Sequence, residues 1–204
     1  MQPTDPIAAE LWNTKRVSGL ECRTHRTLME SGGVIVSIDE RYRYVLWRLW
    51  QKHLGVATFV MLNPSTADEK KPDPTVTKCV GFAQRWGLGG ILVVNLFGLR
   101  SPHPSVLEHA QDPVGPHNAY FVSKVLDTSW TKRCVLAWGN EGSLNARDEA
   151  FLVVNAHREM YGLKPPGKPC LTREGNPRHP SRIGYESELV PVVWDGALKE
   201  RGEG

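Results

Sequence analysis

The chain has 204 residues, a formal net charge of +3 and a pI near 8.7. This length suits one domain of ordinary size, and the mildly basic balance permits nucleic-acid binding without requiring it. The 4 cysteines form no C-x-x-C pair, which argues against a zinc or iron–sulfur site. No signal peptide or long apolar run is apparent, so we expect a cytoplasmic protein with no membrane segment. We also expect no cofactor.

The first half of the chain predicts an N-terminal lead-in, a hairpin and a βαβ unit. Residues 1–33 have weak periodicity and predict a flexible or partly helical lead-in, followed by a single domain over residues 34–204. Bulky and charged residues alternate over 42–50, which is typical of a half-buried strand. The further elements expected here are a hairpin partner at 34–38, a central parallel strand at 56–62, a helix capped by Asp73 and Pro74 that runs to Trp86, and a buried strand at 91–94.

The second half continues the alternation of helices and strands. We expect a helix over 116–127, a strand over 133–138, a helix over 144–161, a short strand near Cys170 and a strand over 189–193. This order of elements predicts an α/β fold, a three-layer α/β/α sandwich around a mainly parallel central sheet.

Polar residues follow the predicted strands in three short segments: Asn63 with Pro-Ser-Thr, Asn95, and His179 with Pro-Ser. Ligands of open α/β sheets bind beyond the carboxyl ends of the strands, so we expect these segments to share one site. A side-chain amide matches a base edge that presents a carbonyl beside a ring N–H, which favours Asn95 as a base reader. The alternative is that Asn95 bonds neighbouring backbone in a loop.

Four motifs carry a family resemblance: FVMLNPSTAD at 59–68, GILVVNLFGL at 90–99, VLAWGN at 135–140 and HPS at 179–181. In this order they resemble the uracil-DNA glycosylase superfamily over residues 56–181. The chain is also similar to members of a bacterial and phage family catalogued without an assigned function. The first resemblance implies a uracil-DNA glycosylase-like fold and base excision, in which a nucleotide is flipped from the DNA and its N-glycosidic bond is hydrolysed.

The resemblance also implies roles for individual residues. Asn63 matches the position that holds the attacking water, where many members have Asp, and an amide cannot serve as an anionic base. His179 matches the histidine that donates a hydrogen bond to the departing base, although a histidine among arginines could instead bind phosphate. Asp68 is a secondary catalytic candidate, because it has no obvious capping role and could supply the charge that Asn63 lacks.

The remaining candidates bind the base or the DNA. Phe97 and Trp138 could stack on the base, with core packing as the alternative. Ser65 and Ser181 could hold phosphates, or serve only as turn residues. The stretch 164–182 is rich in Lys and Arg, including Arg178, and could follow a phosphate backbone. Arg182 or Ile183 stands where the family places the wedge that fills the gap left by the flipped base.

The sequence thus predicts a monomeric DNA glycosylase that acts on an unusual or modified pyrimidine, in repair or in defence against modified phage DNA. DNA is its expected partner. The alternative is a non-catalytic reader of modified or uracil-like bases on the same fold. The phosphate-loop, dinucleotide-binding and G-x-S-x-G motifs are absent from the sequence, which disfavours other enzymes of α/β sheets.

Overall fold

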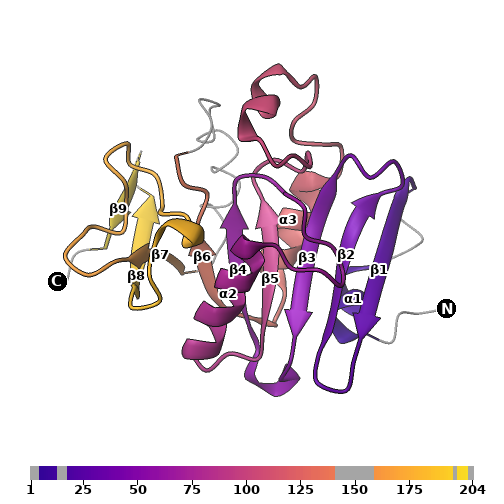
Figure 1. The fold of residues 1–204 in the computed structure, drawn as a ribbon, viewed down its shortest axis with the longest axis horizontal. Helices are drawn as coiled ribbons and strands as arrows, with labels where there is room; N and C mark the ends of the chain where they lie inside the picture. Colours follow the sequence, from indigo (N-terminus) through magenta and orange to yellow (C-terminus); the bar gives the residue numbers. More distant parts are fainter. Residues whose placement is uncertain (1–4, 13–17, 141–158, 195–196, 202–204) are drawn as a thin grey trace.

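The fold is built on one mixed β-sheet, seen face-on in Figure 1. The computed structural model describes residues 5–12, 18–140, 159–194 and 197–201. Within these ranges 9 strands form a sheet in the order β1-β2-β3-β5-β4-β6-β7-β8-β9. The strands are β1 (Leu20–Arg26), β2 (Ser31–Ser37), β3 (Arg43–Leu49), β4 (Val56–Met61), β5 (Gly90–Asn95), β6 (Thr131–Leu136), β7 (Met160–Lys164), β8 (Glu188–Trp194) and β9 (Leu198–Glu200).

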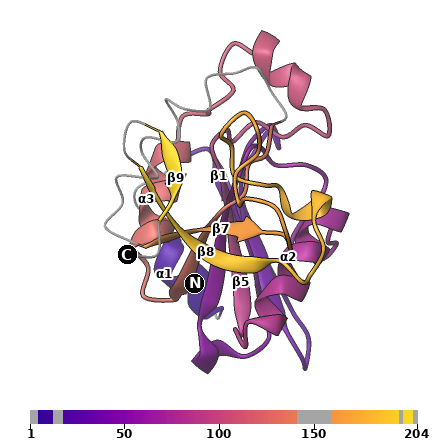
Figure 2. The ribbon, with the colours of Figure 1, turned by 90° about the vertical axis from the view of Figure 1, so that its left-hand side faces the viewer.

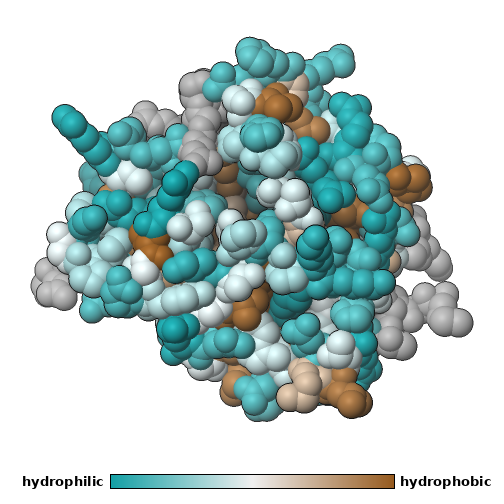
Figure 3. Space-filling view, in the orientation of Figure 1, coloured by the Kyte–Doolittle hydropathy of each residue, from teal (hydrophilic) through white to brown (hydrophobic). Residues whose placement is uncertain are grey.

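The described residues form three α-helices, which lie on opposite faces of the sheet. Figure 2 shows α2 (Pro74–Arg85) on one side of the strands and α1 (Pro6–Leu11) with α3 (Asn118–Asp127) on the other. Short 3₁₀ turns are η1 (Lys52–Leu54), η2 (Pro104–His109) and η3 (Pro180–Arg182). No described helix is long and apolar enough to cross a membrane. The face in Figure 3 is mostly hydrophilic, with hydrophobic side chains in small groups.

The prediction of a three-layer α/β/α sandwich with a mainly parallel sheet is wrong. Only β4–β5, β4–β6 and β6–β7 are parallel among the described strand pairs, and the other 5 pairs are antiparallel. The predicted βαβ unit does exist, since α2 connects β4 to its parallel neighbour β5. However, antiparallel strands extend the sheet at both ends, and β3 joins it by pairing antiparallel with β5.

Apolar residues of alternate sheet positions build a separate core on each face. On one face Phe59 stacks near Trp86, with ring centroids 6.0 Å apart, and α2 covers the strands. On the other face Tyr44 packs on Phe121 of α3 at 5.5 Å. Burying each such aromatic side chain stabilises the fold by about 1.5–3 kcal/mol. These two cores fix β4 and β5 between helices and so fix the ends of both strands.

Several predicted elements are confirmed. The β2–β3 hairpin, the parallel strand β4, and the strands β5, β6 and β8 all form, as does α3. The Asp73 side chain caps α2 by accepting from the Val76 N–H at 2.8 Å, and Pro74 is the first helical residue. Local capping and periodicity signals were therefore sufficient to place these elements.

Other segments differ from the prediction. The predicted lead-in supplies α1 and β1, and β1 pairs with β2 in the sheet. The expected strand near Cys170 is reduced to an isolated bridge between Leu171 and Pro177. The expected helix over 144–161 lies mostly outside the described residues, and its last two residues, Met160 and Tyr161, begin β7. β3 is buried along its whole length, not half-buried, and it carries two arginines into the interior.

Candidate functional site

Polar residues converge where β4 and β5 end, at the upper edge of the sheet in Figure 1. Met61 of β4 lies opposite Asn95 of β5 in the parallel register, so the two exit loops begin side by side. Two adjoining cavities open there, a larger site cavity of about 380 Å³ and a smaller site cavity of about 220 Å³. Both are lined by Asn63, Pro104, His179 and Arg182. The structure therefore brings the three predicted strand-end segments together.

Asn63 joins the two exit loops through its amide nitrogen. Its Nδ2 donates to the carbonyl of Ser101 at 2.9 Å and to that of Pro64 at 3.2 Å. The Ser101 N–H also donates to the Pro64 carbonyl, at 2.9 Å. Because all these partners are acceptors, the amide orientation is fixed, and Oδ1 is the atom left for a ligand. Asn63 can therefore accept a hydrogen bond from water or from a ligand N–H.

Asn95 is an almost fully buried amide without a side-chain partner. It is 2% exposed and lines the smaller site cavity. Its backbone carbonyl accepts from Asn118 Nδ2 at 2.9 Å, but its side-chain amide makes no hydrogen bond with any described residue. Its amide atoms reach the cavity, so water or a ligand there can meet the hydrogen-bonding capacity that a fully enclosed amide would leave unmet at a cost of about 1–3 kcal/mol. An amide held ready at a cavity wall is suited to bind a ligand that offers both a donor and an acceptor.

Asn118 of α3 holds the end of β5 and was missed in the sequence. Its Nδ2 donates to the carbonyls of Asn95 and Leu96 at 2.9 and 2.8 Å. These bonds fix the backbone that carries the Asn95 side chain. An Asn at the start of an amphipathic helix gave no sequence signal for this role, because its partners are distant in the chain.

The turn that follows His179 determines which of its two ring nitrogens carries the proton in the neutral form. The Ser181 backbone N–H donates to His179 Nδ1 at 3.3 Å, and Ser181 Oγ lies 2.7 Å from the same nitrogen. A backbone N–H can only donate, so Nδ1 accepts and the neutral ring carries its proton on Nε2. In the neutral form of His179 the donor is therefore Nε2–H.

Gly139 allows His179 to approach the end of β6. Gly139 has φ of +72°, and a Cβ built on it would lie 3.0 Å from the His179 Cβ. Its N–H donates to the Pro177 carbonyl at 2.9 Å, which ties the histidine loop to the strand exit. The glycine of the Trp138-Gly139 motif is therefore needed at this position because a side chain would crowd His179.

A hydrogen-bonded network braces the loop that leads to His179. Asn140 Oδ1 accepts from Thr172 at 2.7 Å and from Asn176 at 3.1 Å, while Asn140 Nδ2 donates to Glu174 at 2.6 Å. Hydrogen bonds from the Glu174 backbone N–H, from the Thr172 side chain and from Asn140 hold the pKa of the Glu174 carboxyl below its usual value. The loop is therefore fixed from both sides of the larger site cavity.

The other base-binding candidates take different positions. Trp138 is 3% exposed, lines the larger site cavity and donates from Nε1 to Asn176 at 3.4 Å. Phe97 is also 3% exposed, but it packs in the core on the α3 face and lines neither site cavity. The core alternative thus fits Phe97, whereas Trp138 stands at the site.

The DNA-binding candidates surround the two cavities. Arg178 and Ile183 line the larger one, and Ser65 and Ser181 the smaller one. Arg178 Nε donates to the Pro169 carbonyl at 2.7 Å, so it also braces the loop. Ile183 packs partly against the core on the α2 face, and its carbonyl accepts from Lys78 at 2.9 Å, whereas Arg182 is exposed.

Asp68 is not part of this site. It lines a third cavity of about 130 Å³, with Arg23, Glu40 and Arg100 among its walls, which we call the Asp68 cavity. Its Oδ1 accepts from the N–H groups of Lys70 and Lys71 at 2.8 and 2.6 Å. Burial alone would raise the pKa of Asp68, but the backbone N–H groups of Lys71 and Lys70 outweigh it and the pKa is lowered.

Arg43 of β3 is a site residue that the sequence did not reveal. It is 3% exposed and lines both the smaller site cavity and the Asp68 cavity. Burial lowers the pKa of its guanidinium to about 10, and the nearby Asp73 only partly offsets this. The alternation of residues 42–50 is typical of a half-buried strand, in which Arg43 would be exposed. In the structure every residue of β3 is buried, so Arg43 lies in the interior.

The site shows no pattern for a resident metal. Among the described residues, no group of three or more His, Cys, Asp or Glu could hold a metal ion. The side chains that do converge are amides, hydroxyls, a histidine and arginines, which bind ligands through hydrogen bonds and charge.

The matched region of the chain contains most of this site. The family model described as "Protein of unknown function (DUF1643)" matches residues 43–181. The chain belongs to this family. In this DUF1643 member the match begins at Arg43 and ends at Ser181, so it includes Asn63, Asn95 and His179. No curated protein and no solved structure matches the chain.

Proposed function

We propose that this protein is a DNA glycosylase that excises an unusual or modified pyrimidine. The target nucleotide is flipped into the site cavities, its N-glycosidic bond is hydrolysed, and an abasic site remains. The observation that carries the proposal is the convergence of a buried, unpaired Asn95 amide, a His179 ring protonated on Nε2 and the Asn63 Oδ1 acceptor. A planar base with carbonyls and a ring N–H satisfies all of these groups.

Each of these groups has a task in the reaction. Asn95 pairs with the carbonyl and ring N–H edge of the base. Asn63 Oδ1 accepts a hydrogen bond from the attacking water, whose oxygen adds to C1′ as the bond to the base breaks and whose surplus proton passes to solvent. The base leaves with the bonding electron pair, and His179 Nε2–H donates to the oxygen on which negative charge grows. One such donor contributes roughly two to three powers of ten in rate.

The surrounding residues fit the handling of flipped DNA. Flipping a nucleotide requires a few kcal/mol, and the requirement is lowest for a mispaired or altered base. Ser65, Ser181 and Arg178 hold phosphates, and Trp138 offers an aromatic wall to the base. Of the two wedge candidates, Arg182 is exposed while Ile183 packs against the core, which favours Arg182 for insertion into the stack.

The two adjoining cavities support an enlarged substrate. Asn95 stands in the smaller site cavity, and the larger one continues past Asn63 and His179 toward Trp138. A base read by Asn95 would therefore have room for a ring substituent. Modified bases of phage DNA are accordingly the expected substrates. The corresponding role of this monomeric cytoplasmic enzyme is repair or defence against phage.

The test is direct excision. The purified protein is incubated with single-stranded and duplex oligonucleotides that carry uracil, a thymine mismatch or a pyrimidine with a bulky 5-substituent. We expect alkali-labile abasic sites at the modified pyrimidine, and fewer or none at plain uracil. Cleavage at plain uracil, together with no cleavage at any enlarged base, would refute the proposed specificity for modified pyrimidines.

A non-catalytic reader of modified bases is the second candidate, and one observation favours it. Asn63 has no charge, and its amide nitrogen is engaged with backbone carbonyls, while Asp73, a carboxylate at the wall of the smaller site cavity, is engaged as the cap of α2. In that case the protein would bind an oligonucleotide with a modified base, and no abasic site would form on any substrate. Gel-shift and cleavage measurements on the same oligonucleotides separate the two candidates.

A further inference from the structure

Arg43 is a buried cation at the wall of the proposed base pocket, and its guanidinium is only partly paired. Nη1 donates to the Ala67 carbonyl at 2.6 Å. Nε is enclosed and has no hydrogen-bond partner among the described residues, and no described carboxylate lies within ion-pair distance of Arg43. An ionised group buried without a counter-charge is costly, so such a group is retained where something else meets its charge.

The charges around Arg43 do not neutralise it. Arg48 and Arg100 act on it with like charge, while Asp73 and Asp68 act with opposite charge. However, Asp73 is engaged as the cap of α2, and Asp68 accepts from two backbone N–H groups. Asp73, His179 and Arg182 line the same cavity as Arg43, so two arginines face one carboxylate there. The smaller site cavity therefore has an excess of positive charge at its wall.

Asn95 provides a second, independent sign of a ligand in this cavity. Its amide is buried, unpaired and lines the same cavity as Arg43. A ligand that satisfies both must be planar, must offer a donor and an acceptor to the amide, and must carry negative charge. A pyrimidine that has lost a ring proton, or that has just left its sugar, has this description.

We propose that Arg43 and Asn95 together form a site for the anionic form of a pyrimidine base, in which the buried guanidinium stabilises the negative charge that the base acquires as it departs. This inference rests on the proposed function and adds to it a source of leaving-group stabilisation. As the C1′–N1 bond breaks, its electron pair remains on N1 and spreads to the ring carbonyls. The base takes a proton from solvent after departure. A fixed charge that is already in place needs no reorganisation during this step.

The experiment compares free bases of similar size at one neutral pH, so that the protonation of the protein is constant. The probes are 5-nitrouracil, which is ionised at neutral pH, and thymine, which is neutral. Calorimetry gives the ratio of their affinities for the wild type, Arg43→Gln, Arg43→Lys and Arg41→Gln. Arg41 is an exposed arginine close to the same strand and lines neither site cavity, which makes it the matched control.

We expect the wild type and Arg41→Gln to bind the ionised base about 10- to 100-fold more tightly than thymine, as for a charge-assisted contact. Arg43→Gln should lose this preference, and Arg43→Lys should keep most of it. The proposal is overturned if the wild type shows no preference for the ionised base, a result that does not depend on whether Arg43→Gln folds. It is also overturned if Arg43→Gln folds and keeps the preference for the ionised base.

Excision of oligonucleotides, measured in parallel, distinguishes the two levels of inference. A preference for the ionised base without excision of any substrate refutes the glycosylase but supports the anion site. Excision without that preference refutes the anion site and leaves the glycosylase standing. If both hold, Arg43→Gln should slow excision more for thymine than for 5-fluorouracil, because the better leaving group needs less stabilisation.

Discussion

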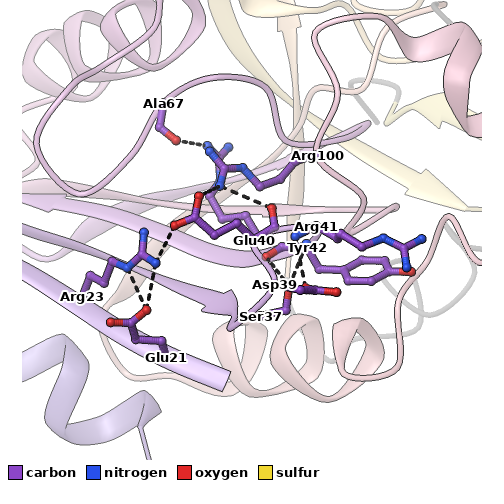
Figure 4. A network of polar contacts seen from close by, with 10 residues as sticks. Glu21, Arg23, Ser37, Asp39, Glu40, Arg41, Tyr42, Ala67 and Arg100 are labelled. Carbon is purple, nitrogen blue, oxygen red and sulfur yellow. Dashed lines mark hydrogen bonds and ion pairs between the residues drawn. The ribbon is translucent and has the colours of Figure 1, made fainter. Parts of the chain in front are cut away.

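Arg43 separates two polar cavities that differ in how their side chains are paired. In the Asp68 cavity, Asp68 accepts from two backbone N–H groups, and Glu40 pairs with Arg23 at 2.6 Å and with Arg100 at 3.8 Å. Figure 4 shows Glu40 between these two arginines. In the smaller site cavity, by contrast, the Asn95 amide has no partner among the described residues.

This difference separates groups that hold the fold from groups that await a ligand. Paired polar side chains fix loops: Glu40 connects β1 to the loop after β5, and Asp68 shapes the loop after β4. Unpaired buried groups reduce stability. Among the described residues, Asp5 Oδ2, Tyr44 Oη and Asn118 Oδ1 are also enclosed without a partner, but only Arg43 and Asn95 combine missing partners with a place at the wall of the smaller site cavity. Both cavities are polar and charged, so polarity alone would not have identified the site.

The contrast predicts its largest effect at His179. Replacing His179 by Ala removes the Nε2–H donor and should lower single-turnover excision by about 10²- to 10³-fold. Rapid-quench measurement of excision gives the rate. His53→Ala is the control, because His53 is an exposed histidine in η1, before β4 begins. Equal rates for wild type and His179→Ala would remove the histidine from the chemistry.

Asn63 and Asn95 should differ in their effect on stability although both are amides. Asn63→Ala removes the Nδ2 hydrogen bonds to Ser101 at 2.9 Å and Leu99 at 3.5 Å, which join the exit loops, and the one to Pro64 at 3.2 Å within its own loop. It should lower the free energy of unfolding by about 1–3 kcal/mol. Asn95→Ala removes no side-chain hydrogen bond and should change stability by less. It should instead alter which base is bound. Urea titrations of the two variants measure the difference, and a larger loss in Asn95→Ala would contradict this assignment.

Gly139→Ala should have a smaller effect on excision, through the position of His179. The added Cβ would lie 3.0 Å from the His179 Cβ, and a displaced donor should slow excision about tenfold. Gly167→Ala is the matched control. Gly167 has a similar φ of +68° with no atom within 4 Å of a Cβ, so it reproduces the backbone strain without the contact. An equal slowing in both variants would exclude the contact with His179 as the cause.

Local signals explain what the sequence predicted correctly. The Asp73-Pro74 cap fixed the start of α2, and the apolar runs before Asn63 and Asn95 fixed β4 and β5. Since parallel neighbours end at the same edge of a sheet, the convergence of Asn63 and Asn95 followed from these elements. His179 lies close to Asn63 and Asn95 because the Gly139 N–H binds the Pro177 carbonyl in the loop before it. Hydrophobic periodicity does not predict a contact of this kind.

Non-local pairing explains what the sequence could not predict. A hairpin pattern does not say which sheet edge it will join, so the antiparallel pairing of β3 with β5 was not expected. The same pairing buries Arg43, which an alternating pattern placed in solvent. β1 was missed because its residues are only partly buried at the sheet edge, and Phe97 turned out to face the core and not the cavity.

Asp68 should give the smallest effect, and it should act on stability alone. Because its pKa in the folded protein is below the unfolded value of about 3.9, its stabilising contribution is present above that pH and is lost as the pH falls through the folded pKa. Asp68→Ala should therefore lower stability by about 1 kcal/mol near pH 7, and its difference from wild type should shrink below about pH 4. Urea titrations at several pH values measure this change.

Excision by Asp68→Ala should equal that of wild type, since the carboxylate lies in the Asp68 cavity and not in the site cavities. A tenfold or greater loss of excision in a stable Asp68→Ala protein would instead mean that the loop after β4 brings this carboxylate to the substrate, and that the paired cavity also takes part in the reaction.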